Sequence, residues 1–189
     1  MLNKIIASVL LGCCSLTSVF ASELQEKKQV LKVMNNYATS VACWSGVSSK
    51  DIFTIDRDEE SGYSTYFVLW SGNKNCDAGI ASQSFYVSEV SKISNRAFTV
   101  KSDDAFGGNS EEFWTQEKIT VPYINYRFIE SIKQIKPDSF EIIAWNYADD
   151  KFGGTDSGNN PANKFNYTLQ LTESEGWKIT NQTLLEQNK

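Results

Sequence analysis

The chain has 189 residues, of which 18 are basic and 23 acidic, and its formal net charge is −5. This acidity argues against nucleic acid and anionic membranes as partners, because both would repel the chain. Histidine is absent, which excludes serine–histidine and cysteine–histidine catalysis and every metal site built on imidazole.

Residues 1–21 predict a secretory signal peptide. Lys4 is their only charged side chain, and residues 5–11 form an apolar run that is too short to span a bilayer. Val19-Phe-Ala21 offers small side chains at the two positions that a signal peptidase reads. We expect a single periplasmic domain over residues 22–189, with no stable membrane insertion after the cut.

A lipoprotein is the alternative to soluble export. Leu10-Leu-Gly-Cys13 resembles a lipobox, in which Cys13 would become a lipidated N-terminus. The apolar run before it is very short, and Leu11 is uncommon at its position. Soluble export to the periplasm is therefore the main prediction.

Residues 22–44 predict the first helix, because apolar side chains recur along one face. We expect this stripe to contact the core, with Glu26 among the charged residues on the other faces. The stripe consists of Val30, Met34, Tyr37, Val41 and Trp44.

Cys43 and Cys76 are the two cysteines that remain after a cut behind Ala21. Two cysteines in an exported chain most simply form one disulfide. The chain-entropy estimate for a loop of this length is about 4 kcal/mol of stability. A reactive thiol is the competing interpretation, but it would need an activating neighbour, and the chain has neither a CxxC motif nor a histidine.

Residues 63–70 and 84–90 predict two strands, joined by a turn-rich connection that holds Cys76. Before them, residues 45–62 are expected to form a polar connection with one short apolar piece. A further short strand is expected at residues 97–100.

In the second half of the chain, Pro137-Asp-Ser139 predicts a tight turn and a hairpin between its flanking strands. The predicted strands cover residues 127–136, 140–147 and 164–172, and a last strand begins at Trp177. We expect the tail from Glu186 to fray. Together these elements predict an α+β fold, in which the N-terminal helix packs on one antiparallel sheet of five or six strands.

Residues 149–163 are rich in glycine and asparagine and form a long connection, which is typical of functional or disordered loops. Phe152 is its one large apolar residue, among Asp149, Asp150 and Asp156. An apolar side chain among acids suits insertion into a cationic cleft, so these four residues are predicted to bind a cationic protein partner. A loop without a role is the alternative. The same segment offers oxygen donors for calcium but lacks the EF-hand spacing.

Clusters of carboxylates are the remaining catalytic candidates, since a glycan-acting enzyme needs an acid and a base. All of them lie in polar, turn-like segments, where solvated acidic side chains are ordinary. The clusters are Asp56/Asp58/Glu59/Glu60, Asp103/Asp104, Glu111/Glu112 and Asp149/Asp150. The chain has no GxxxxGK[ST] loop and no GxGxxG fingerprint, so we expect no cofactor and no metal.

Tryptophans lie on or beside several of the predicted strands, at positions 70, 114, 145 and 177. Most of them are expected to lie in the core. An exposed aromatic face around Trp70 and Trp145 is a second candidate surface for a glycan or a protein partner.

Several segments resemble small exported proteins of Gram-negative bacteria. The resemblance is carried by Cys43, Tyr66-Phe-Val-Leu-Trp-Ser-Gly72, Cys76-Asp-Ala-Gly79, Arg127-Phe-Ile, Phe140-Glu-Ile-Ile-Ala and Gly176-Trp-Lys. It implies periplasmic residence and one disulfide, and it brings no catalytic residues with it.

Export, small size, acidity, a disulfide and the missing catalytic groups together predict a non-enzymatic periplasmic binding protein. We expect an inhibitor or immunity-type protein that binds a secreted hydrolase. The alternatives are an accessory factor for assembly or secretion in the envelope and a carboxylate-dependent enzyme that acts on glycans.

Overall fold

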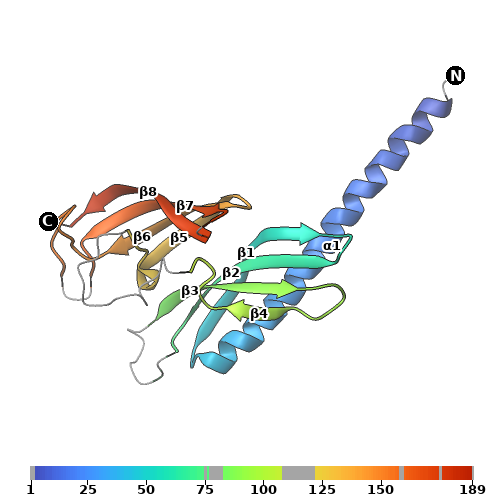
Figure 1. Cartoon of the computed structure of the whole chain (residues 1–189). Coiled ribbons are helices and arrows are strands. Elements are labelled where there is room, and N and C mark those ends of the chain that lie inside the picture. Colours follow the sequence, from blue (N-terminus) through green and yellow to red (C-terminus); the bar gives the residue numbers. More distant parts are fainter. Residues whose placement is uncertain are drawn as a thin grey trace.

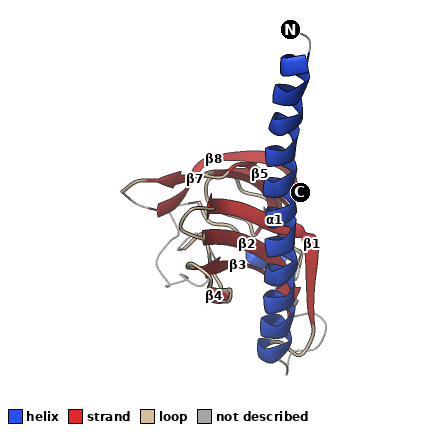
Figure 2. Cartoon of the chain, turned by 90° about the vertical axis from the view of Figure 1, so that its right-hand side faces the viewer, coloured by secondary structure: helices blue, strands red, loops and turns tan. Residues whose placement is uncertain are grey.

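The computed structural model describes residues 3–74, 76, 83–107, 122–157, 160–174 and 176–188, with side chains from residue 22 onward. A long helix, α1 (Asn3–Val41), packs on one face of a four-stranded sheet, and a second four-stranded sheet lies against the other face (Figures 1 and 2). The order of the layers is therefore helix, first sheet, second sheet.

Both sheets are antiparallel meanders, in which each strand pairs with the next one along the chain. The first sheet consists of β1 (Ser45–Asp58), β2 (Tyr63–Gly72), β3 (Ser84–Lys92) and β4 (Thr99–Ser102). After the short 3-10 helix η3 (Tyr126–Phe128), the second sheet consists of β5 (Ile129–Lys136), β6 (Ser139–Asn146), β7 (Asn163–Thr172) and β8 (Gly176–Gln187).

The predicted single sheet of five or six strands is wrong. Over the residues that the structure describes, eight strands form two sheets, and one of the additional strands is β1, where a polar connection was predicted. β1 is largely polar, and its extended form depends on pairing with β2 along most of its length. Such pairing is a long-range contact that no local pattern in the sequence reveals.

β2 is the central strand of the molecule, because both of its faces are covered. Tyr66, Val68 and Trp70 pack toward α1, while Phe67 and Leu69 pack toward the second sheet. A strand that is buried on both faces is apolar along most of its length, as residues 66–70 are. The sequence predicted this strand from its aromatic and β-branched residues.

The helix contacts the first sheet through Val30, Met34 and Ala38, which are fully buried. The predicted stripe shares Val30 and Met34 with this line, but after Met34 it continued with Tyr37 and Val41 in place of Ala38. Trp44 is 50% exposed, because α1 ends at Val41 and Trp44 lies beyond it. At its other end α1 continues without a break past residue 22, and Figure 1 shows this part extending away from both sheets.

The second core lies between the two sheets and is largely aromatic. Phe67 of β2 contacts Phe106, Phe140 and Trp177, with ring centroids between 5.4 and 6.2 Å apart. Phe53 of β1 adds an edge-to-face contact with Phe140. Side chains from both sheets therefore fill one continuous core.

The strands of the second sheet follow the predicted order, but the last one is longer than expected. Phe165, Tyr167 and Leu169, which alternate along β7, are buried, whereas Leu171, the next residue of the alternation, is 46% exposed. β8 runs to Gln187, whose Nε2 donates 2.8 Å hydrogen bonds to the Phe152 carbonyl and to Asn163 Oδ1. The predicted fraying from Glu186 is therefore wrong.

The disulfide is confirmed, and it joins Cys43 to Cys76 with their Cα atoms 5.6 Å apart. Cys43 lies just after α1, and Cys76 follows β2. The bond therefore ties the end of the helix to the connection that leaves the central strand.

Candidate functional site

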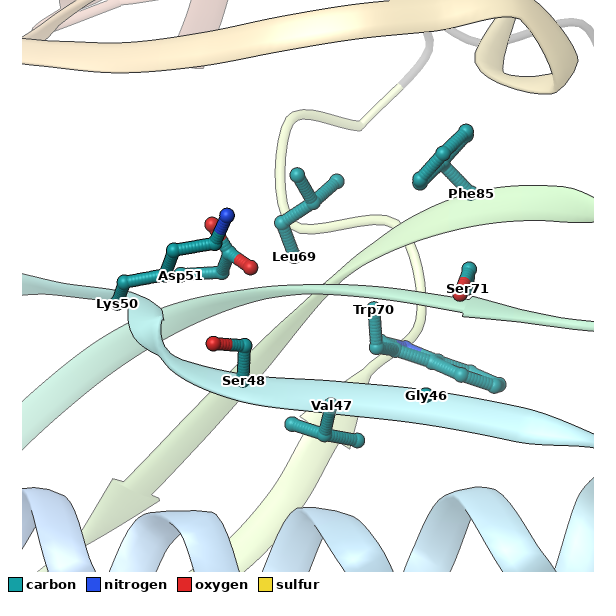
Figure 3. Close-up of a pocket in the computed structure, with 9 residues that line it drawn as sticks. All are labelled: Gly46, Val47, Ser48, Lys50, Asp51, Leu69, Trp70, Ser71 and Phe85. Carbon is teal, nitrogen blue, oxygen red and sulfur yellow. The ribbon is translucent and has the colours of Figure 1, made fainter.

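A pocket of about 310 Å³ opens beside an irregularity in β1 (Figure 3). Val47 pairs with Trp70 and Ile52 pairs with Val68, so the four residues from 48 to 51 stand opposite Leu69 alone. The extra residues cannot all stay in the ladder, so the strand bulges, and the pocket lies next to the bulge. The Ser-Ser-Lys-Asp run that bulges is polar and has few β-formers.

The pocket combines apolar walls with a polar edge. Leu69 and Phe85 supply apolar surface, and Figure 3 shows them on the side of the first sheet that faces the second sheet. Lys50 and Asp51 rise from the bulge on the same side, whereas Val47 lies on the side of the helix. The remaining lining residues are Gly46, Ser48, Trp70 and Ser71.

Asp51 is the unusual group in this pocket. Burial raises the pKa of its carboxyl above the ordinary value, and the charge of Lys50 opposes this only in part. In the part of the chain that the structure describes, the Asp51 carboxylate has no hydrogen bond and no ion pair within 4.0 Å. A partly desolvated carboxylate without a partner is a candidate acceptor for a cationic group of a ligand.

The structure places Asp149, Asp156 and Phe152 in contacts within the chain. Asp149 Oδ1 accepts the N–H groups of Lys151 and Phe152, and Asp156 Oδ1 accepts those of Ala148 and Ala162. The Phe152 ring packs at 4.8 Å, edge to face, against Phe165 in the core between the sheets. These contacts hold residues on both sides of the loop's undescribed positions 158 and 159, and partner binding by the loop stays a prediction.

Asp150, the fourth residue predicted for this loop, is exposed. Glu111, Glu112 and Trp114 lie outside the described residues. No group of three or more cysteine, aspartate or glutamate side chains that could hold a metal ion is found among the residues that the structure does describe.

Two of the remaining carboxylate clusters take part in ion pairs or hydrogen bonds. Glu59 forms an ion pair with Arg57 at 2.8 Å. Asp103 forms one with Lys74 at 2.7 Å, and Asp104 accepts a hydrogen bond from the Tyr126 hydroxyl. Catalysis by these carboxylates stays an untested alternative.

The predicted aromatic face around Trp70 and Trp145 does not exist as one surface. Trp70 is 1% exposed between α1 and the first sheet, whereas Trp145 belongs to the second sheet. Trp145 donates its Nε1 hydrogen to Glu130, which also pairs with Lys164. The sequence shows that both tryptophans lie on strands, but it does not show that the strands belong to different layers.

Glu26 is the residue that sequence reasoning missed. It was predicted on a solvent face, yet it is only 9% exposed. It precedes Val30 by one helical turn, on the same line as Val30, Met34 and Ala38, so this spacing was the available signal. The strand register places Arg57, Ser64 and Lys92 side by side across β1, β2 and β3 beneath it.

Four donors converge on the Glu26 carboxylate. Arg57 Nε and Ser64 Oγ donate to Oε2 at 3.0 Å, the Tyr66 hydroxyl donates to Oε2 at 2.6 Å, and Lys92 Nζ donates to Oε1 at 2.7 Å. Burial alone would raise the pKa of Glu26, but these four hydrogen bonds outweigh it and lower the pKa to about 2.

The Glu26 cluster, Glu26 with Arg57, Ser64, Tyr66 and Lys92, fastens the helix to the sheet. Its carboxylate has donors for about all of its acceptor positions, so it is poorly placed to exchange a proton with a substrate. The pocket beside Asp51 is therefore the better candidate for a functional site.

No family model, curated protein or solved structure matches this chain. Among the residues that the structure describes, no helix is both long enough and apolar enough to cross a membrane.

Proposed function

We propose that this protein is a non-enzymatic binding protein of the periplasm, which holds a segment of a cationic partner protein in the pocket beside Asp51. The observation that supports it is the Asp51 carboxylate, which is partly buried and has no hydrogen bond or ion pair among the described residues. A lysine or arginine of the partner would supply a close counter-charge, because Lys50 offsets the burial of Asp51 only in part.

The walls of the pocket suit the rest of such a segment. Leu69 and Phe85 can contact an apolar side chain or the methylene stem of a basic one. A net charge of −5 attracts a cationic partner over a distance and raises its rate of association. Since the pocket is small, we expect it to take one or two side chains within a larger interface.

The partner class that we propose is a secreted hydrolase, which the protein would inhibit in the manner of an immunity protein. This part of the proposal rests on predicted export, small size and acidity. An envelope assembly factor and a carboxylate-dependent glycan-acting enzyme remain the alternatives from the sequence.

The test is capture of a partner from periplasmic extract with three proteins: the wild type, Asp51→Lys and the control Asp138→Lys. Asp138 is exposed on the turn between β5 and β6, so the control makes the same charge change away from the pocket. We expect one stoichiometric partner that the wild type and the control retain and that Asp51→Lys loses.

Titration of the purified partner should show at least a tenfold loss of affinity for Asp51→Lys, which corresponds to about 1.4 kcal/mol. Equal affinity of all three proteins would refute the pocket as the binding site. A captured hydrolase should lose activity when the protein is added. Turnover of a glycan by the protein itself, abolished when a carboxylate pair is neutralised, would favour the enzyme instead.

A further inference from the structure

The ammonium group of Lys74 occupies a site that has the components of a cation receptor. Its Nζ lies 2.7 Å from Asp103 Oδ2 and 4.0 Å from the centroid of the Tyr86 ring. The Trp70 ring centroid is 5.5 Å away. A carboxylate next to aromatic faces is the combination by which proteins bind lysine side chains and quaternary ammonium groups.

This site is built by elements other than the connection that carries Lys74. Trp70 and Tyr86 are paired across β2 and β3, and their rings stack with centroids 4.5 Å apart. Tyr37 of the helix donates to Asp103 Oδ2 at 2.8 Å, and Ser88 donates to Oδ1 at 3.3 Å.

Further contacts hold the components of the site in place. The Trp70 indole donates to Ser88 Oγ at 2.8 Å. Burial and the nearby Asp103 raise the pKa of Tyr37 to about 12, so its phenol stays protonated and continues to donate. The carboxylate and both rings are thus positioned by helix and sheet residues without Lys74.

Lys74 itself belongs to the connection after β2 and lies two residues before Cys76. Its side chain is 29% exposed and that of Asp103 is 33% exposed, so an external cation can reach the carboxylate from solvent. In its position Lys74 resembles a ligand bound to a receptor that the rest of the fold supplies.

We propose that Asp103, Tyr86, Trp70 and Tyr37 form a binding site for an alkylammonium group and that Lys74 fills it as a displaceable internal ligand. The external ligand is the side chain of a lysine on a partner protein. This site does not rest on the pocket beside Asp51. Trp70 lines that pocket too, but Trp70 and Tyr86 pack toward the helix, whereas Leu69 and Phe85 lie on the other face of the first sheet.

The test uses the full chain with Lys74→Met, which removes the charge and keeps a flexible apolar side chain. Butylammonium, which has the end group of lysine, is titrated into the protein by calorimetry, and tryptophan fluorescence is followed in parallel. We expect Lys74→Met to bind butylammonium at least tenfold more tightly than the wild type. Lys101→Met, a change of an exposed lysine on β4, should behave like the wild type.

Adding Asp103→Asn to Lys74→Met should abolish the gained affinity, because the carboxylate supplies the counter-charge. Lys74→Gln is a second variant in case Lys74→Met does not fold. Binding of butylammonium no stronger than that of the wild type would overturn the proposal. Failure of both variants to fold would also overturn it, since a displaceable ligand cannot be required for the fold.

Discussion

At the scale of single residues, Glu26 and Asp51 show how different surroundings give two carboxyl groups opposite properties. Glu26 is buried and accepts four hydrogen bonds, which lower its pKa. Asp51 is partly buried without such donors, and burial raises its pKa. The first arrangement stabilises the fold, whereas the second leaves a group that is available to a ligand.

Stability should fall in acid because of Glu26. The unfolded chain takes up a proton near pH 4.5, whereas the folded chain keeps Glu26 charged until about pH 2. The charged Glu26 therefore contributes to the free energy of unfolding above pH 4.5, and this contribution is lost as the pH falls toward 2. Its size is on the order of 3 kcal/mol. Urea unfolding of Glu26→Gln should show a loss of this order at pH 7 and little loss near pH 2.

The control for this experiment is Glu60→Gln, which changes an exposed glutamate at the end of β1. Its stability should follow that of the wild type at every pH. A deficit in Glu26→Gln that stayed constant from pH 7 to pH 2 would contradict the assigned role of the charge.

Asp51→Asn should stabilise the protein slightly at pH 7. A raised pKa means that the folded state holds the proton more firmly than the unfolded state, so the charged form costs stability above the folded pKa. The gain should be about 0.5 kcal/mol or less, because solvent screens this partly exposed group. It should shrink as the pH falls to the ordinary value of 3.8, and melting curves at several pH values would measure it.

At the scale of elements, α1 is held on the first sheet at three places. The Glu26 cluster holds it near residue 26, the apolar line of Val30, Met34 and Ala38 covers the middle, and the disulfide holds the end at Cys43. Tyr37 adds a hydrogen bond to Asp103 between the last two. A polar cluster at one end of the apolar strip and a covalent bond at the other leave the helix one register on the sheet.

The disulfide should contribute measurably to this attachment. Cys43→Ser should lower the free energy of unfolding by about 2–4 kcal/mol, because the unfolded chain is no longer closed into a loop. The double variant Cys43→Ser/Cys76→Ser should match the single one, since both lose the same bond. Chemical denaturation would measure this, and an unchanged unfolding midpoint would show that the bond does not stabilise the attachment.

At the scale of the whole molecule, Phe67 connects the two sheets. It lies on the central strand and contacts Phe106, Phe140 and Trp177 in the core between the sheets. Because both sheets share this core, they should unfold together.

Phe67→Ala should destabilise the whole molecule by about 3–5 kcal/mol, since it leaves a cavity in the shared core. Leu171→Ala, at an exposed leucine of β7, should change stability by less than about 0.5 kcal/mol. Far-ultraviolet circular dichroism and tryptophan fluorescence should report one common transition. Two separate transitions would mean that the sheets form independent units.

The predicted cut after Ala21 should leave a mature chain that begins at Ser22. Two residues at this new end already contact the first sheet, because Arg57 donates to Ser22 and Thr54 donates to Glu23. The helix start should therefore stay attached after the cut. Intact-mass measurement on the exported protein would test the prediction, and a lipidated Cys13 would contradict it.

Local patterns in the sequence were sufficient for several elements. Cys43 and Cys76 were paired because they are the two cysteines left after the predicted cut. β2 was predicted from its aromatic and β-branched residues, and β7 was predicted as a strand over residues 164–172. In each case the signal lies within a few neighbouring residues or in a simple count. Such signals survive folding because they reflect burial on a strand or a covalent bond.

Only the tertiary structure decided the layers, the pocket and the cluster around Glu26. The four groups that bind Glu26 lie 31 to 66 residues away along the chain. Only the register of β1, β2 and β3 places Arg57, Ser64 and Lys92 in one row, with Tyr66 two residues further along β2. The pocket likewise depends on where β1 leaves its ladder with β2. Side-chain periodicity tells which residues turn inward, but strand pairing decides which of them meet, and pairing is a contact between distant parts of the chain.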